Sequence, residues 1–316
     1  MIVLLSRRFA GLILTLIAVS LLIFTVMAVL PGDPAAITLG TSATPETLAA
    51  LRHTMGLDQP LMLRYGRWLL GAFTGDLGQS YTYGVPVGGL ILERLAVTLP
   101  LAVFAIFLSI AIAVPLGVAA AARRGGVFDI LATILSQMSI AVPGFWVALL
   151  LIILFSTTLG LMPAGGFPGW GNGLLPALKA LALPAIALAL PQAGVLTRVT
   201  RTAMIDVMHE DFVRTARAKG LSRRSVLWNH VVPNALVPVL TILGLQFTFL
   251  VAGAVLIENV FNLPGLGRLA YQALNQRDII VMQDVVVFFA GLVVVMNFLV
   301  DLSYLAIDPR LRGREL

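Results

Sequence analysis

The chain has 316 residues, a formal net charge of +6 and no cysteine; 59% of its residues are hydrophobic and 11% are charged. The mean hydropathy of +0.98 indicates a membrane protein, because a soluble domain cannot bury so much apolar surface. The lack of cysteine excludes disulfides, Cys-based metal sites and thiol catalysis. No pair among His53, His209 and His230 has the spacing of metal ligands.

Apolar runs along the chain predict six transmembrane helices. A span needs about 20 mostly apolar residues. Six runs come close to this, at about 9–30, 98–122, 129–158, 181–199, 235–257 and 285–307. The first run is longer than the roughly 7–15 apolar residues of a signal peptide, so we expect it to be retained as a span. The sequence therefore predicts an all-α membrane protein.

The distribution of basic residues predicts that both termini lie in the cytoplasm. In that topology the inner segments hold 14 of the 21 Lys and Arg residues, and the longer outer segments hold the other 7. Cytoplasmic segments are normally the ones enriched in Lys and Arg. The net charge is therefore read as an orientation signal, and we expect membrane lipid but no nucleic acid as a partner.

The outer segment after the first span is predicted to contain two helices. Thr44 followed by Pro45 is typical of a helix start. Residues 61–73 mix Tyr, Trp and Arg with leucines, which suits a helix lying at the membrane surface. A helix packed on top of the bundle is an equal alternative. The stretches 159–173 and 258–278 are predicted to be outer loops.

A basic segment on the predicted inner side has the pattern helix–glycine–helix. Residues 206–219 place acids early and bases late, as the helix dipole favours. Gly220 can end this helix, and Ser222 can cap a second short helix that runs to about Val232, before Pro233.

Two roles for this segment stay open on physical grounds. We expect Phe212, Ala216 and Gly220 to share one face, whose small residues would let another surface approach closely. The segment could dock a soluble partner in this way. It could equally be a solvated loop or one adsorbed on anionic lipid.

The same segment resembles the EAA loop of ABC-importer permeases, whose pattern is E-A-A-x3-G-x9-I-x-L-P. Gly220 and Pro233 match the glycine and the proline, whereas only Ala216 matches within E-A-A and His230 replaces the isoleucine. The stretch DFVRTARAKGLS, from Asp211, looks like the version found in dipeptide, oligopeptide and nickel permeases.

Further stretches agree with that family in order along the chain. They are LPGDPA from Leu30, MGLDQPL from Met55, GDLGQS from Gly75, NLPGLGRL from Asn262 and LVDLSYLAIDPRLR from Leu299. The chain is thus identified as a member of the dipeptide/oligopeptide/nickel permease family. It departs from the family at RDIIVMQD, from Arg277, where a Tyr-Pro pair usually follows the Asp.

The resemblance implies a type I ABC-importer permease fold in the bacterial cytoplasmic (inner) membrane. Residues 1–97 would form the first transmembrane helix and a long extracytoplasmic segment. Residues 98–307 would form a five-helix permease core with a cytoplasmic coupling loop at about 200–235, and 308–316 a cytoplasmic tail. The implied partners are a homologous second permease, two cytoplasmic ATP-binding subunits and an extracytoplasmic substrate-binding protein.

This chain is not expected to be an enzyme or to hold a cofactor or metal. It lacks the G-x-x-x-x-G-K-[ST] phosphate loop of ATPases, so ATP and magnesium would be bound by the partner subunits. The resemblance implies a role in ATPase coupling for Phe212, Arg214, Thr215, Ala216, Arg217, Gly220, Leu221 and Pro233.

Polar residues within the predicted spans are candidates for the translocation path. Gln137, Gln246 and Asn297 could line it, because polar groups in lipid prefer the bundle interior. Hydrogen bonding between helices is the equal alternative for them. Asp301 is the one acid well inside a predicted span, and we favour a structural partner for it over a role in transport.

The function predicted is that of a pore-forming permease subunit of an ATP-driven importer, which moves di- or oligopeptides by alternating access. Nickel or a nickel chelate is the alternative cargo. A secondary transporter is the alternative of another class, and would call for internal repeats or coupling acids at mid-membrane, which the sequence does not show. The cargo itself and the choice between pairing with a homologue or with a second copy stay open.

Overall fold

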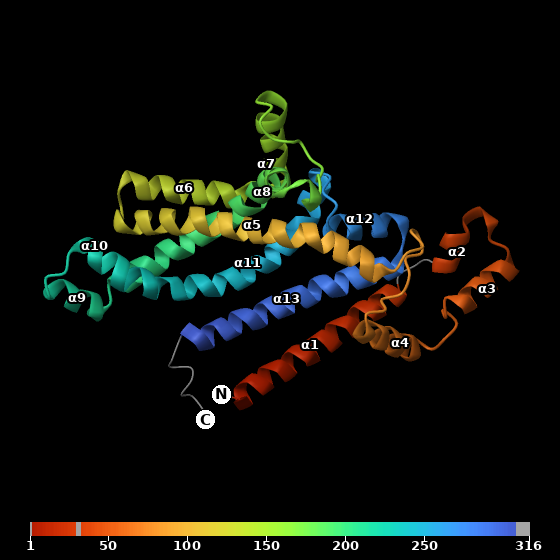
Figure 1. Ribbon diagram of the computed structural model, residues 1–316. Helices are drawn as coiled ribbons and strands as arrows, with labels where there is room; N and C mark the ends of the chain where they lie inside the picture. The colour runs from red at the N-terminus through yellow and green to blue at the C-terminus, as the bar shows by residue number, and fades with distance from the viewer. Residues whose placement is uncertain (1, 30–32, 308–316) are drawn as a thin grey trace. The chain divides into compact units, whose positions relative to one another are not determined.

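The computed structural model describes residues 2–29 and 33–307, and its regular secondary structure is helical (Figure 1). Within those residues the only extended pairing is an isolated bridge between Gln79 and Pro86. In chain order the helices are α1 (Ile2–Val29), α2 (Pro34–Leu39), η1 (Gly40–Ser42), α3 (Pro45–Thr54), α4 (Leu61–Thr74), α5 (Val87–Ala122), α6 (Val127–Ala141), α7 (Gly144–Leu151), η2 (Ile152–Thr158), η3 (Trp170–Asn172), α8 (Leu174–Met208), α9 (Asp211–Ala218), α10 (Arg223–Val226), η4 (Leu227–Val231), α11 (Val232–Val260), α12 (Leu266–Gln276) and α13 (Ile279–Ile307). The segments η2 and η4 are π-helical.

The prediction of an all-α membrane protein is confirmed. Among the described residues, five helices are long and apolar enough to cross a membrane: Phe9–Val29, Val87–Ala122, Leu174–Met208, Arg223–Val260 and Ile279–Val300. A sixth candidate is the bent pair Val127–Ala141 and Gly144–Thr158, whose two parts meet at 100°. The structure thus has five candidate spans, or six if the bent pair is one span.

The predicted third span, about 129–158, is not a straight helix. Its helix α6 ends at Ala141, and Val142 is extended with φ −85° and ψ 126°. Pro143 disfavours the helical conformation in the residue before it and has no N–H to continue the backbone ladder. The bend between α6 and α7 follows from that one residue.

Two other predicted spans are too short. The helix α5 begins at Val87 rather than near residue 98, and α8 covers Leu174–Met208 rather than 181–199. Pro184 and Pro191 lie inside α8 without ending it. Neighbouring helices can satisfy the backbone groups that a proline frees, so an apolar helix tolerates it better than a soluble one does.

The chain divides into two compact units. Unit 1 comprises Met1–Thr98 and Pro264–Phe298, and unit 2 comprises Leu99–Leu263 and Leu299–Leu316. The boundaries fall within α5, between α11 and α12, and within α13, and the two units are described separately below.

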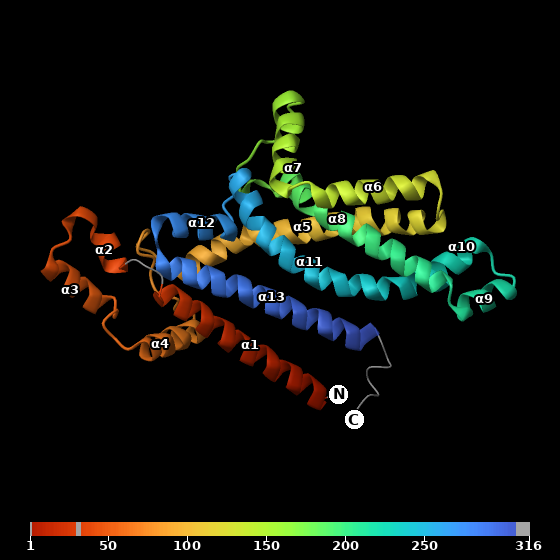
Figure 2. The same ribbon diagram turned by 180° about the vertical axis from the view of Figure 1, so that it is seen from behind.

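In unit 1, α1 and α13 lie side by side (Figures 1 and 2). A side-chain carbon of Leu16 lies 3.8 Å from where a Cβ of Gly291 would stand. The helix α4 packs on α1 through aromatic side chains, with ring centroids 5.4 Å apart for Phe24 and Tyr65 and 6.2 Å apart for Phe24 and Trp68. The helix predicted at 61–73 is therefore present, and one of its faces is packed within the unit.

Buried acids fix the start of α13 within unit 1. Asp278 is 1% exposed and accepts hydrogen bonds from Ser80 Oγ at 2.5 Å and Thr82 N at 3.0 Å. Asp284 accepts one from Trp68 Nε1 at 2.6 Å. These bonds join α4 and the loop after it to α13.

Two predictions for the outer segments have different outcomes. Thr44 caps α3 as predicted: its Oγ1 accepts from Thr47 N at 3.3 Å, and Thr47 Oγ1 accepts from Thr44 N at 2.9 Å. The stretch 258–278 is wrongly predicted as a loop, because most of it forms the end of α11 and the whole of α12. A side-chain hydroxyl supports the start of α12, where Leu266 N donates to Thr98 Oγ1 at 2.8 Å.

Unit 2 is organised around α8, which packs against α6, α7 and α11 (Figure 1). Small residues bring its neighbours close, as expected for helices in lipid. A Cβ on Gly117 of α5 would lie 2.6 Å from Thr200 Cβ and 2.9 Å from the Thr197 carbonyl oxygen. A Cβ on Gly194 of α8 would lie 2.7 Å from the Ser136 carbonyl oxygen of α6.

An ion pair holds α6 to α8. Asp129, 4% exposed, accepts from Arg201 Nε at 2.5 Å and from Arg201 Nη2 at 2.8 Å. Its second oxygen also accepts from Gly125 N at 2.9 Å, which fixes the turn between α5 and α6. Asp129 begins the predicted span 129–158 and Arg201 follows the predicted span 181–199, but the sequence gives no sign that they pair across 72 positions.

We expect Gly117→Ala to lower the melting temperature of the purified protein in detergent. The added methyl group overlaps the Thr197 carbonyl and Thr200, and overpacking of this kind costs about 1–3 kcal/mol. Gly66→Ala in α4 is the matched control, because nothing lies within 4 Å of its Cβ position and helix propensity favours the alanine. An unchanged melting temperature for Gly117→Ala would show that α5 and α8 are not in close contact there.

We expect Arg201→Leu to lower the melting temperature as well, because it leaves the buried Asp129 carboxylate with only its backbone donor. A buried polar group that loses its partner costs about 1–3 kcal/mol. Arg198→Leu removes an exposed charge from the same helix and should have little effect. Adding Asp129→Asn to Arg201→Leu should restore part of the lost melting temperature. Equal melting temperatures for Arg201→Leu and Arg198→Leu would argue against the ion pair.

Candidate functional site

The basic segment forms a short helix at the end of α8, but the break falls earlier than predicted. The predicted helix 206–219 is divided, because α8 continues to Met208 and α9 begins at Asp211. Glu210 between them is extended, with ψ 148°. Asp211 in the first turn and Arg217 in the last suit the dipole of α9, as expected.

The inner face of α9 is locked into the core of unit 2. Val213 is fully buried and Ala216 is 6% exposed. Both belong to a hydrophobic cluster with Met204 of α8, Val226 of α10 and Val231 of η4. The core therefore fixes α9 relative to the ends of two long helices.

The predicted stop at Gly220 is confirmed in detail. Gly220 has φ +82°, its N–H donates to Arg217 O at 2.9 Å, and Leu221 N donates to Ala216 O at 3.4 Å. This pair of bonds is the Schellman motif, which satisfies the last carbonyls of a helix and needs a left-handed residue. Only glycine adopts that conformation without steric cost.

The second helix starts at Ser222 as predicted, but it does not end where predicted. Ser222 caps α10, since its Oγ accepts from Ser225 N at 3.3 Å. The helix does not end before Pro233, however, because α10, η4 and α11 follow one another without a break. Pro233 lies in the first turn of α11, directly after the π-helical turn. The wider π turn changes the local bonding register, which allows a proline that lacks a donor.

The outer surface of α9 combines apolar and cationic groups. Phe212 is 43% and Leu221 41% exposed. Arg214, Thr215, Arg217, Gly220 and Pro233 are also exposed. Arg214 pairs weakly with Asp211 at 3.3 Å across one turn. The expectation that Ala216 shares the free face with Phe212 and Gly220 is wrong, because Ala216 packs inward.

The candidate path residues lie in three different settings. Gln246 is 4% exposed and donates to Gln192 O at 3.2 Å, so it joins α11 to α8. Gln137 is exposed and lines a cavity of about 240 Å³ between α6 and α8, beside Arg198 and Thr202. Asn297 is exposed on α13. Asp301 also lies in α13, but its side chain is outside the part of the chain that the structure describes.

The described residues contain no group of three or more His, Cys, Asp or Glu side chains that could hold a metal ion. The helix α9 is thus a short helix with an apolar and cationic outer surface, and its inner face fixes it to the ends of long apolar helices.

Comparison with protein families gives two matches that together cover most of the chain. The family described as "Binding-protein-dependent transport system inner membrane component" matches residues 113–313. Its N-terminal counterpart matches residues 1–102.

Individual relatives match from end to end. A putative peptide transport system permease protein of Brucella abortus is 45% identical over 309 residues, which is 98% of each chain. A glutathione transport system permease protein of Salmonella paratyphi A is 38% identical over 306 residues, or 97% of each chain. The dipeptide transport system permease protein of Escherichia coli is 37% identical over 333 aligned positions, or 98% of each chain.

Among solved structures, an inward-facing form of the MetNI methionine ABC transporter has a similar fold, with a TM-score of 0.58. The match covers 69% of this chain and 96% of that one at 19% sequence identity. The family match, the end-to-end relatives and the shared fold agree, and the chain belongs to the inner membrane components of binding-protein-dependent transport systems.

Proposed function

We propose that the chain is the pore-forming permease subunit of an ATP-driven peptide importer of the inner membrane. Peptides are proposed as the cargo because the chain is 37–45% identical, from end to end, to relatives named for peptide, dipeptide and glutathione transport. Those names favour peptides over nickel. ATPase and binding-protein partners follow from the family, and we propose a homologous second permease as the third kind of partner.

The proposed topology has six spans with both termini in the cytoplasm, in a type I importer fold. The inner segments hold most of the basic residues, which supports this orientation. The similarity to the MetNI fold supports the helical core. In this topology α6 and α7 with η2 count as one bent span. Residues 1–97, 98–307 and 308–316 keep the roles expected from the sequence.

The outer surface of α9 is proposed to bind an ATPase subunit. Phe212 and Leu221 supply exposed apolar area that a partner groove could bury. Arg214, Thr215 and Arg217 surround it with polar contacts, each worth about 0–1 kcal/mol at an exposed rim.

Three further residues support this element from within the chain. Ala216 holds α9 to the core, Gly220 ends it, and Pro233 lies where α11 begins. Because α9 is fixed to the ends of α8 and α11, a displacement by the ATPase would move those helices. This is the proposed route from ATP hydrolysis to alternating access.

The path through the membrane is proposed to include Gln137 and Asn297, whose amides are exposed in the single chain. Gln246 is a weaker candidate. Its amide already bonds α11 to α8, which supports the alternative of a structural hydrogen bond for this residue.

The role of α9 predicts that Gly220→Leu uncouples the transporter. A leucine is strained at φ +82°, so the Schellman motif opens and the outer surface of α9 shifts. Peptide-stimulated ATP hydrolysis and uptake by the reconstituted complex should fall by about 5–150-fold, the usual range of coupling between sites.

Gly160→Leu is the matched control for that experiment. Gly160 also has a positive φ, +63°, with nothing within 4 Å of its Cβ position, but it lies on the predicted outer side. Uptake should persist in this variant. Full uptake by Gly220→Leu would contradict the placement of the coupling site.

The function as a whole predicts a defined complex. The tagged chain, gently solubilised from its native membrane, should co-purify with a second permease, ATPase subunits and a binding protein, as identified by mass spectrometry. Reconstituted with that binding protein, the complex should import dipeptides only when ATP is present. Purification as a single chain, with transport that survives ATP depletion, would support a secondary transporter instead.

A further inference from the structure

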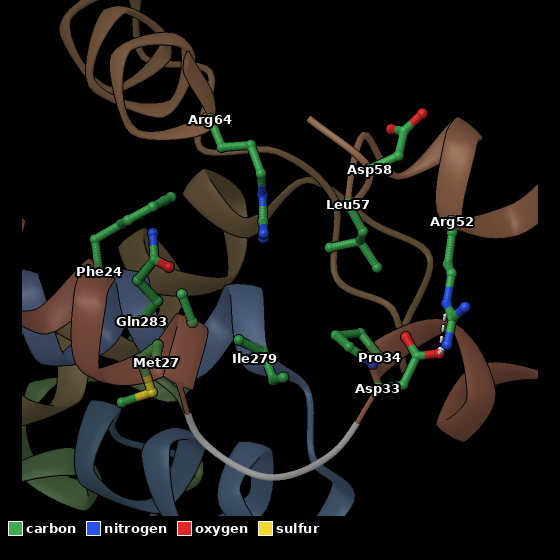
Figure 3. A pocket seen from close by; sticks show the side chains of 11 residues that line it. Phe24, Met27, Asp33, Pro34, Arg52, Leu57, Asp58, Arg64, Ile279 and Gln283 are labelled. Atoms are coloured by element: carbon green, nitrogen blue, oxygen red, sulfur yellow. Dashed lines mark hydrogen bonds and ion pairs between the residues drawn. The ribbon is translucent and has the colours of Figure 1, made fainter. Parts of the chain in front are cut away.

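Two adjoining cavities in unit 1 have no part in the coupling site. Their volumes are about 450 and 310 Å³. They share the lining residues Phe24, Pro34, Leu57, Arg64, Ile279 and Gln283. Figure 3 shows the larger cavity, with Arg64 and Gln283 reaching into it from α4 and α13.

Arg64 carries a positive charge that no described acid neutralises. Its guanidinium lies over the Phe24 ring, 5.9 Å from the centroid, and it makes no hydrogen bond or ion pair to any described residue. The acids around the larger cavity have other partners. Asp33 pairs with Arg52 at 2.7 Å (Figure 3), and Asp58 with His53 at 2.8 Å. The guanidinium of Arg64 is therefore available to a ligand with a negative charge.

Gln283 is a largely buried residue whose amide makes no hydrogen bond to a described residue. Its side chain is 8% exposed, although it lines both cavities. Its amide atoms are accessible from the cavity rather than sealed from it, so they are free to bond a polar group that enters. Its position is well defined, because the neighbouring Asp284 is bonded to Trp68 and the start of α13 is held by Asp278.

The remaining walls of the larger cavity are largely apolar and include Met27, Leu57 and Ile279. A cavity of about 450 Å³ lies within the usual range of about 300–1,000 Å³ for small-molecule sites. Together these groups offer a guanidinium for a carboxylate, an amide for a peptide bond and apolar contacts for a side chain. A free peptide end combines these three features.

We propose that this cavity is a receiving site for the C-terminal carboxylate of the cargo peptide, with Arg64 binding the carboxylate and Gln283 the adjacent peptide group. The proposal rests on the proposed function as a peptide importer. The other source of a carboxylate is an acidic side chain of the binding protein. Gln283 lies on the wall of the cavity and contributes little to the outer surface, so its partner must enter the cavity, and a chain end enters more readily than a folded surface.

The test measures peptide binding to the purified permease–ATPase complex without its binding protein, by isothermal titration. The probes are alanyl-phenylalanine and its C-terminal amide. The wild type should bind the free acid at least about tenfold more tightly than the amide, because a hydrogen bond to a charged group is lost in the amide. Arg64→Gln should abolish this preference, and Gln283→Leu should weaken the binding of both probes.

Arg277→Gln is the matched control. It removes one exposed positive charge from unit 1 and lines neither cavity, so the preference for the free acid should remain. Arg64→Lys keeps the charge and should retain part of the preference. A melting temperature in detergent close to that of the wild type shows that each variant is folded.

Several outcomes would overturn the proposal: no binding of either probe to the wild type, equal binding of acid and amide, or an unchanged preference in Arg64→Gln. The proposal also fails if the Arg64→Gln complex no longer binds the ligand-free binding protein but still binds the peptide, because Arg64 would then bind an acidic group of that protein. ATP-driven uptake with the binding protein is measured on the same preparation. Uptake without carboxylate-dependent binding would refute this site alone, whereas no peptide uptake at all would refute the proposed function.

Discussion

The structure depends on one constraint, which is that backbone polar groups have no water to bond with inside a lipid bilayer. A helix satisfies them within its own segment, and this explains why a chain with 59% hydrophobic residues is helical throughout its long apolar runs. Apolar burial cannot hold such helices together, since lipid is equally apolar. Close contact at Gly117 and Gly194, and specific polar bonds such as Asp129 to Arg201, take over that role.

This way of packing also explains how force could pass through unit 2. The helix α8 is long, and its prolines do not end it. It is held to α6 by the ion pair near one end and leads within two residues into α9. Val213 and Ala216 then join α9 to the same core. A contact on the outer face of α9 is therefore connected to the long helices by packed side chains rather than by a loose loop.

Local chemistry could be predicted from the sequence, and tertiary effects could not. The stop at Gly220 and the caps at Thr44 and Ser222 depend on a few adjacent residues, and all three are confirmed. The bend at Pro143 and the continuous helix through Pro233 involve the same residue type with opposite results. The outcome depends on whether neighbouring turns can rearrange, as the π turn before Pro233 does.

At the candidate site, too, local features could be predicted from the sequence and contacts between distant residues could not. The spacing of Gly220 and Pro233 marked the segment, but the inward direction of Ala216 depends on α8 and η4, which only the folded chain brings together. Arg64 and Gln283 lie more than 200 positions apart and belong to no motif, so their shared cavity could not be found by reading along the sequence.

The shortness of α9 has a consequence for how the transporter is assembled. A helix of 8 residues is not stable alone in water, where about 12–15 residues are needed even for favourable sequences. The surface proposed for the ATPase therefore exists only after α8 and α11 have packed and buried Val213 and Ala216. An unfinished or damaged permease would present no such surface. Recruitment of the ATPase would then act as a check on the quality of the membrane subunit, so that ATP is not hydrolysed on a chain that cannot transport.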